Sequence, residues 1–388
     1  MSDDTGGLID RSVQESETKT YDVIIVGAGA AGIGVAIALA DAGVENFLIV
    51  DRDTVGSSFS SWPEDTRFIT PSFPSNSIGM LDLNSIAVGV SPGYSMKIEH
   101  PTGADFAKHL QDLARYFELP IQENTNVKVI EKQQDLFYLT TDERILTSTN
   151  VIWAAGEYQY PNMDVFLGSE LCRHTATVDK YASLEGDDFL IIGGYESGID
   201  AAYHLSNLNK KVSVFDINNP WDSTTSDPSV SLSVFSFERM RSPNFHKKTE
   251  LFPGTEVNSV TLDNGVYELE TEDGRKFHSE VQPLLAGGFS GSHNFVSHLF
   301  EQREDNFPLL SECDESTKVP GMYLCGPSVR HEGHVFCFIY KYRQRFAIVA
   351  NAIATSLGIE TDEFVKNYKS WGMYLDDLSC CGQECLTC

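Results

Sequence analysis

Positive charge and long apolar runs are what this sequence has least of. In 388 residues, 28 Lys and Arg stand against 56 Asp and Glu, which gives a formal net charge of −28 at pH 7. This acidic excess leaves phosphate repulsion uncompensated, so we expect no binding to nucleic acid or to an anionic membrane. No apolar run approaches the roughly 20 residues of a transmembrane helix. The composition predicts a globular protein of two or three domains.

The first twenty residues also lack the apolar core of a signal peptide. They are polar and acidic, so we expect a disordered leader over residues 1–20 and a cytoplasmic protein. Structural disulfides are rare in that compartment, which favours redox or metal-binding roles for cysteine. Of the eight cysteines, four are scattered and four crowd the last nine residues. They are Cys172, Cys313, Cys325 and Cys337, followed by Cys380, Cys381, Cys385 and Cys388.

The most informative stretch runs from residue 21 to residue 51. An apolar run, VIIV, predicts a buried parallel strand, and Gly27, Gly29 and Gly32 follow it as G-x-G-x-x-G. The first glycine allows a tight turn, the second lets the backbone approach a pyrophosphate, and the third lets the next helix pack closely. A second apolar strand then ends at Asp51, where an acid can hold a ribose hydroxyl. The stretch predicts a dinucleotide site.

The same plan recurs between residues 188 and 216. A strand, a GGYESG turn, a helix from about residue 199 to 208 and a second strand lead to Asp216. Gly193 and Gly198 match the first copy, but Tyr195 replaces the middle glycine. The repeat predicts either a second nucleotide site, with Ser197 donating to a phosphate, or a degenerate fold that binds nothing. No Arg or Lys follows Asp216 closely, which favours NADH over NADPH.

Other segments fill in an α/β organisation. We expect a long irregular loop after Asp51, a hairpin through the DNG turn, and a final helix from about residue 335 whose N-terminus points at the cofactor. Further elements are a helix at 104–117 and strands at 127–131, 136–140, 150–156, 257–262, 266–270 and 321–327. NVIWAAG and PLLAGGF mark two crossings between domains.

Taken in order, these motifs resemble those of the flavoproteins with two dinucleotide-binding domains. That superfamily includes thioredoxin reductase-like enzymes and flavin-containing monooxygenases. The resemblance spans about residues 21–357 and rests on GAGAAG with its acid, GSSFSSW, AAGEYQYP, GGYESGIDAA, LAGGF and VPGMYLCGP. GGYESGIDAA is similar to the bacillithiol-disulfide reductase group. In VPGMYLCGP, Pro327 stands where the family has an acid contacting the FAD ribityl chain.

The resemblance implies an α/β fold with two Rossmann-like domains. It places a discontinuous FAD-binding domain at 21–160 and 284–360, an NAD(P)-binding-like domain at 161–283 and a Cys-rich tail at 361–388. It also implies residues that contact each cofactor. Those for FAD are Gly27, Gly29, Gly32, Asp51, Arg52, Ser58, Trp62, Val127, Ala155, Gly156, Gly326 and Pro327. Those for NADH or NADPH are Gly193, Gly194, Ser197 and Gly198.

The acceptor side of the reaction is less clearly marked. The redox cysteine pairs of disulfide reductases are absent from their usual places, and Phe166, Gly168 and His174 only approximate the monooxygenase signature. The tail LSCCGQECLTC is similar to the C-terminal LSCC of mercuric reductases. Its four cysteines, Cys380, Cys381, Cys385 and Cys388, could form a redox relay, hold Zn²⁺ or a soft metal, or carry no chemistry. We assign them a catalytic role, with no certain metal.

Some side chains keep two interpretations. Cys337 is either a core thiol or a thiol near the flavin, and Arg330, His331 and His334 either bind an anionic group or form a solvated loop. Trp62 is interpreted as packing around the flavin.

The sequence therefore predicts a homodimeric enzyme resembling FAD-dependent pyridine nucleotide-disulfide oxidoreductases. It would pass electrons from NAD(P)H through FAD to a small-molecule or protein disulfide, a persulfide or a thiol-bound metal. The alternatives are a flavin monooxygenase acting on an N or S nucleophile, and a non-catalytic redox sensor that binds flavin or metal.

Overall fold

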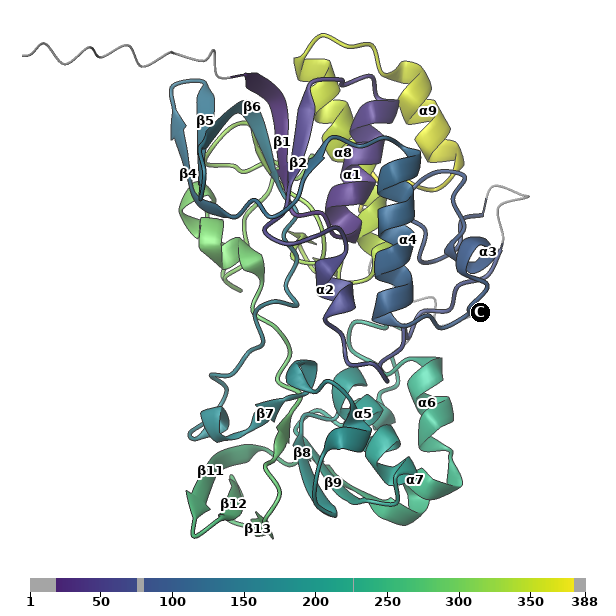
Figure 1. The fold of residues 1–388 in the computed structure, drawn as a ribbon, viewed down its shortest axis with the longest axis vertical. Helices are drawn as coiled ribbons and strands as arrows, with labels where there is room; N and C mark the ends of the chain where they lie inside the picture. Colours follow the sequence, from purple (N-terminus) through teal and green to yellow (C-terminus); the bar gives the residue numbers. More distant parts are fainter. Residues whose placement is uncertain (1–18, 75–79, 226, 380–388) are drawn as a thin grey trace, which may run out of the picture.

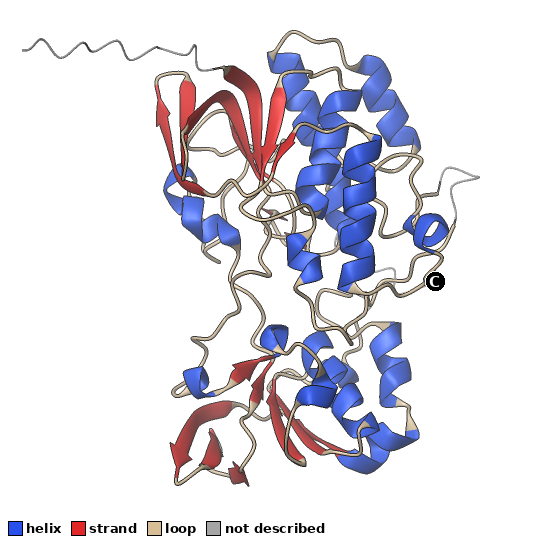
Figure 2. Ribbon diagram, viewed as in Figure 1, coloured by secondary structure: helices blue, strands red, loops and turns tan. Residues whose placement is uncertain are grey.

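The fold has two lobes, each built around a parallel sheet (Figure 1). The structure is a computed structural model, and it describes residues 19–74, 80–225 and 227–379. The first lobe contains the N-terminal sheet and the last helices, and the second contains the middle of the chain (Figure 2). No helix in the described ranges is both long and apolar enough to cross a membrane.

The sheet of the first lobe combines a parallel half with an antiparallel half. Its strands run in the order β3-β2-β1-β6-β5-β4, and β15 pairs with the C-terminal part of β6. The pairs β1–β2, β1–β6, β2–β3 and β6–β15 are parallel, whereas β4–β5 and β5–β6 are antiparallel. The strands are β1 (Thr20–Val26), β2 (Phe47–Val50), β3 (Ile121–Gln122), β4 (Val127–Gln133), β5 (Leu136–Thr141), β6 (Ile145–Trp153) and β15 (Met322–Leu324).

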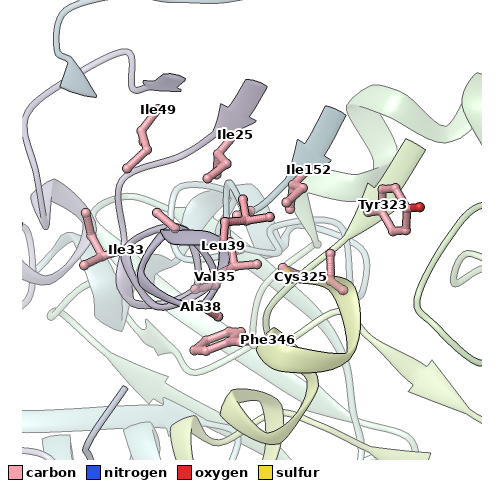
Figure 3. Close-up of a cluster of buried hydrophobic side chains, with 14 of the residues drawn as sticks. Ile25, Ile33, Val35, Ala38, Leu39, Ile49, Ile152, Tyr323, Cys325 and Phe346 are labelled. Atoms are coloured by element: carbon pink, nitrogen blue, oxygen red, sulfur yellow. The ribbon is translucent and has the colours of Figure 1, made fainter. Parts of the chain in front are cut away.

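Helices α1 and α8 cover the parallel half of this sheet. Their small and apolar side chains are almost all buried, which explains why α1 has no polar face. Figure 3 shows Ile25, Ile49 and Ile152 of the strands above α1, with Phe346 of α8 on its other side. The helices of this lobe are α1 (Ala30–Asp41), α2 (Ser57–Ser60), α3 (Pro92–Met96), α4 (Gly103–Tyr116), α8 (Ile339–Ser356) and α9 (Asp362–Ser370).

The second lobe repeats the arrangement with a smaller, wholly parallel sheet. Its order is β10-β9-β8-β14-β7, from β7 (Arg173–His174), β8 (Asp188–Ile192), β9 (Lys211–Asp216), β10 (Thr249–Pro253) and β14 (Leu284–Leu285). Its helices are α5 (Glu196–Asn207), α6 (Val234–Met240) and α7 (Pro243–Lys248). An antiparallel meander joins β11 (Val257–Asp263), β12 (Val266–Thr271) and β13 (Lys276–Ser279). Short 3-10 turns are η2 (Ser169–Leu171), η3 (Thr175–Thr177), η4 (Tyr181–Ser183), η5 (Pro220–Asp222) and η6 (Ser292–Leu299).

Polar contacts hold the two lobes together. The hydroxyl of Thr66 donates to Asp200 of α5 over 2.8 Å, and the carboxylate of Asp65 accepts from the Tyr181 amide over 2.9 Å. The rings of His100 and Phe235 stack with centroids 3.9 Å apart. These contacts fix how the second lobe faces the carboxyl ends of the first sheet.

Three boundaries differ from the sequence predictions. Helix α5 begins at Glu196, three residues before the expected Ile199, so the glycine turn leads straight into it. Helix α8 begins at Ile339 rather than near residue 335, because the preceding residues form a hairpin of β16 (Arg330–His331) and β17 (His334–Val335). Strand β14 pairs with β7 and β8 of the second lobe, so the chain returns to the first lobe after Leu285 instead of at residue 284. The predicted leader lies almost entirely outside the described residues.

Candidate functional site

A cavity of about 930 Å³ lies between the two lobes. Its lining comes from the β1–α1 turn, the end of β2, the loop that includes α2, both crossings, the start of α5 and the start of α8. Of the predicted FAD contacts, the lining includes Gly27, Gly29, Asp51, Arg52, Ser58, Trp62, Val127, Ala155, Gly156 and Pro327. Gly32 and Gly326 lie behind this surface. The structure thus brings distant predicted residues to one site.

The β1–α1 turn shows why glycine stands at three positions. Gly27 has φ +110°, and a Cβ there would lie 2.5 Å from the carbonyl oxygen of Ala154. A Cβ at Gly32 would lie 1.8 Å from the carbonyl oxygen of Gly27, so this glycine sets the close helix–strand approach. At Gly29 a Cβ would meet nothing within 4 Å, and this open space is part of the cavity.

Asp51 closes the adjacent side of the turn. Its carboxylate accepts from the amides of Ala28 (2.6 Å) and Asp53 (2.8 Å). Burial raises the pKa of Asp51, and these two hydrogen bonds oppose the shift. A carboxylate has about four lone-pair positions, so capacity remains for a ligand hydroxyl.

Aromatic side chains form a wall of the cavity. The Trp62 ring lies 5.0 Å from Phe68, 5.4 Å from Phe59 and 6.2 Å from Tyr158, measured between centroids. The Tyr158 hydroxyl lies within hydrogen-bonding distance of the Ser61 and Ala176 carbonyl oxygens, which belong to different lobes. Such a wall suits a flat ring system.

The start of α8 forms the opposite end of the cavity. Cys337, Phe338 and Ile339 line it, and the unpaired amides of the first helical turn place a positive dipole end there. Burial raises the pKa of the Cys337 thiol, while its hydrogen bond to Ser229 and the charge of Lys341 oppose this. Across residues 19–74, 80–225 and 227–379, Cys337 is the one cysteine that lines the cavity.

The residues present fit FAD. The open cradle at Gly29, the α1 N-terminus and Asp51 suit a pyrophosphate and a ribose, and the aromatic wall suits the ring system. Pro327 lines the cavity without supplying the acid that the resemblance places there, so ribityl hydroxyls must find other partners.

The turn of the second lobe has the same backbone geometry with different side chains. Gly193 has φ +96°, a Cβ at Gly198 would lie 1.9 Å from the Gly193 carbonyl oxygen, and Gly194 donates its amide to Asp216 over 2.7 Å. Tyr195 occupies the position equivalent to Gly29. Ser197 lines the cavity, whereas the three glycines lie outside the lining.

The sequence interpretation missed Glu157. It follows Gly156 in AAGEYQYP and lines the cavity, and burial raises the pKa of its carboxyl while the charge of Arg330 opposes the shift. Because nothing in the local pattern distinguishes Glu157 from a surface acid, only its position after the crossing glycine could have drawn attention to it.

The basic residues before α8 have neither of the two roles considered. Arg330 donates to the carbonyl oxygens of Pro327 (2.5 Å) and Val329 (2.8 Å), and His331 bonds to Asp314 over 2.5 Å. Asp314 also pairs with Arg345 of α8 over 2.8 Å. These groups brace the hairpin against the helix instead of binding an anion or facing solvent.

The remaining cysteines divide into core thiols and the tail. Cys172 and Cys325 are buried, and Cys313 is half-buried beside Ser311. His174 of the approximate monooxygenase signature bonds to the Gly288 carbonyl and to the Ala176 amide. Cys380, Cys381, Cys385 and Cys388 lie outside the described residues. In the part that is described, no three His, Cys, Asp or Glu side chains gather to form a metal site.

Comparison with known proteins agrees with this geometry. The family model described as pyridine nucleotide-disulphide oxidoreductase matches residues 24–326. The chain belongs to this family. It is therefore an FAD-dependent oxidoreductase, and the predicted superfamily and its α/β fold are confirmed.

Curated relatives match the chain over only part of their length. It is 31% identical over 122 residues to an uncharacterized CzcO-like oxidoreductase of Geobacillus kaustophilus, covering 30% of this chain and 35% of the relative. It is 24% identical over 318 residues to the flavoprotein-sized component F of alkyl hydroperoxide reductase in Staphylococcus epidermidis, covering 79% of this chain and 54% of that protein. The chain thus spans about half or less of these relatives.

Solved structures share the fold at low identity. The bacillithiol disulfide reductase of Staphylococcus aureus superposes with a TM-score of 0.70 at 19% identity, covering 87% of this oxidoreductase and 99% of that chain. The ornithine N-hydroxylase of Kutzneria sp. 744 gives 0.67 at 13% identity, covering 87% and 100%. At such identities the likeness shows the fold alone.

Proposed function

We propose that this oxidoreductase passes electrons from NADH or NADPH through FAD to a disulfide, a persulfide or a thiol-bound metal. The tail cysteines Cys380, Cys381, Cys385 and Cys388 serve as the relay in this proposal. For a disulfide, NAD(P)H, one proton and the disulfide give NAD(P)⁺ and two thiols. The single observation that carries the proposal is the cavity shared by both lobes, in a chain of this family.

FAD supplies the redox chemistry when bound, because it accepts a hydride and then passes its electrons to an acceptor. The chain holds it through Gly27, Gly29 and Asp51, and the aromatic wall excludes water from the ring system. The N-terminus of α8 favours negative charge at the cavity end that it faces. Glu157, with its raised pKa, is placed to hold the proton that the acceptor needs.

The anchoring of the chain before the tail supports the relay. The amide of Leu375 donates to the Gln344 carbonyl over 3.1 Å, and its own carbonyl accepts from Arg345 over 2.6 Å. Gln344 lies roughly 7.5 Å along α8 from Ile339 at the cavity. Five residues separate Leu375 from Cys380, a covalent reach of roughly 17 Å. The anchor therefore leaves Cys380 enough chain to approach that end of the cavity.

Replacing Cys380 and Cys381 together with Ser tests the relay. We expect the reduction of a model disulfide, DTNB, by NADPH or NADH to fall at least about 100-fold, because an attacking thiol is lost. Anaerobic reduction of FAD by the nucleotide should stay within about twofold of wild type, because the cavity is unchanged.

The matched control is Cys313→Ser, which lies outside the cavity lining and should leave both reactions unchanged. Wild-type DTNB turnover in the Cys380→Ser/Cys381→Ser protein would rule out the relay.

A flavin monooxygenase acting on an N or S nucleophile is the second candidate. The observation favouring it is that, among the described cysteines, Cys337 alone lines the cavity, so no cysteine pair adjoins the flavin position. This function predicts oxygen consumption equal to nucleotide consumption in the presence of substrate. It also predicts that the Cys380→Ser/Cys381→Ser protein keeps full turnover.

A further inference from the structure

The two glycine turns differ at one position that decides whether a pyrophosphate has room. Gly29 has φ −83° and ψ −167°, and Tyr195 has φ −81° and ψ −165°, so the two backbones coincide in conformation. At Gly29 a Cβ would enter open space, which is the cradle for a pyrophosphate. In the second lobe the same direction is taken by the side chain of Tyr195. The tyrosine is unstrained there, and it occupies the phosphate position.

A short segment fixes the tyrosine in that position. We call residues Asp227–Ser236 the covering segment. The Tyr195 hydroxyl lies 2.5 Å from the carbonyl oxygen of Pro228 and 2.9 Å from that of Ser231, and it shares its proton between them. Burial raises the pKa of this hydroxyl, so it remains a donor throughout the physiological range. The covering segment therefore closes over the start of α5.

An acid completes the closure at the α5 N-terminus. Glu196, in the first turn, accepts from the Ser233 amide (2.5 Å) and the Ser236 hydroxyl (2.6 Å) of the covering segment. A carboxylate here already occupies the positive end of the helix dipole and would repel a pyrophosphate. The first turn of α1 carries no acid. The two nucleotide folds thus differ in charge as well as in space.

The other end of the covering segment reaches the flavin cavity. Lys341 of α8 donates to the carboxylate of Asp227 over 2.9 Å and to the hydroxyl of Ser229 over 2.7 Å. The same hydroxyl lies 3.3 Å from the sulfur of Cys337. One segment therefore blocks the second nucleotide fold and also caps the cavity thiol.

We propose that the covering segment couples nucleotide binding to the exposure of Cys337. In the arrangement seen here it closes both sites. When a dinucleotide places its pyrophosphate at α5, Tyr195 and the covering segment leave, and the cap on Cys337 leaves with them. By linkage, anything that frees the thiol also tightens nucleotide binding by the same factor. The inference rests on the proposed electron donor, and Tyr195 is the positioning residue.

The test measures thiol exposure and binding, with no turnover involved. Full-length, FAD-loaded protein is treated with iodoacetamide with and without saturating ADP-ribose, and peptide mass spectrometry follows each cysteine separately. ADP-ribose has the pyrophosphate but no nicotinamide ring that could shield the cavity. We expect the alkylation rate of Cys337 to rise at least about tenfold, while that of Cys313 stays constant. An unchanged rate for Cys337 under saturation would overturn the coupling.

Two variants separate the tyrosine from its hydrogen bonds. Tyr195→Phe keeps the ring and loses both contacts, so we expect faster Cys337 alkylation without any nucleotide. Tyr195→Gly restores the open cradle and should bind ADP-ribose at least about tenfold more tightly than wild type. Equal affinity in wild type and Tyr195→Gly contradicts the inference. Flavin absorbance and circular dichroism confirm that each variant is folded.

Failure of the proposed electron donor gives a different result. If neither NADH nor NADPH reduces the flavin in wild type or in Tyr195→Gly, the proposed donor is wrong. Tighter ADP-ribose binding by Tyr195→Gly together with faster Cys337 alkylation would still establish the covering segment as a coupling element.

Discussion

Two acids at equivalent places carry different consequences at the scale of single residues. Asp51 and Asp216 each end the second strand of a nucleotide fold, and each accepts an amide of its glycine turn. The first faces an open cradle, and the second lies beside Trp221, whose Cζ3 would be 2.3 Å from a Cβ at Gly194. The same residue type therefore meets a cavity in one lobe and packed side chains in the other.

Asp51→Ala should weaken FAD binding about 10- to 100-fold, because a hydrogen bond to a charged group contributes about 1.5–3 kcal/mol. Dialysis of the apoprotein against FAD, followed by flavin fluorescence, measures the dissociation constant. Asp216→Ala is the matched control in the second lobe and should leave FAD affinity within about twofold of wild type. Equal losses in both variants would show that Asp51 acts through stability alone.

At the scale of elements, the contact between α1 and α8 fixes the cavity. A Cβ at Gly34 would lie only 2.1 Å from the Phe346 ring, which is fully buried (Figure 3). The start of α8 reaches the cavity because this contact sets how closely the two helices approach. Gly34 is a packing requirement that the dinucleotide pattern does not explain.

This contact predicts a coupled pair of substitutions. Gly34→Ala should destabilise the protein by about 1–3 kcal/mol through overpacking. With Phe346→Leu also present, the combined loss should fall short of the sum by at least about 1 kcal/mol, since the smaller side chain makes room. Urea unfolding of the first lobe, followed by flavin release, measures these losses. Gly34→Ala with Phe189→Leu in the other lobe should be additive, and additivity in the first pair would contradict the account.

Element boundaries show where sequence patterns stop being sufficient. The apolar periodicity predicted α4 and the strands of both sheets closely, because these segments bury one consistent face. It placed the start of α8 too early, since nothing local reveals that Arg330–His331 pairs with His334–Val335. The position of Phe338 in extended backbone before the helix depends on that hairpin.

At the scale of the whole molecule, the packing of the lobes creates what the sequence could not reveal. The glycines and acids of both nucleotide folds were recognisable because each motif is local. The approach of Ser229 to Cys337, 108 residues apart, depends on how the second lobe sits on the first. The same holds for Glu157, which becomes a cavity residue only when both crossings are in place.

The central claim is that reduced nicotinamide nucleotide delivers electrons to FAD in this cavity. Anaerobic titration of the purified, FAD-loaded protein with NADH and with NADPH tests it most directly, by following the flavin absorbance band. The account predicts complete bleaching at one equivalent of nucleotide per flavin, with NADH preferred because no Arg or Lys follows Asp216 closely. A flavin that dithionite bleaches but neither nucleotide bleaches would contradict it.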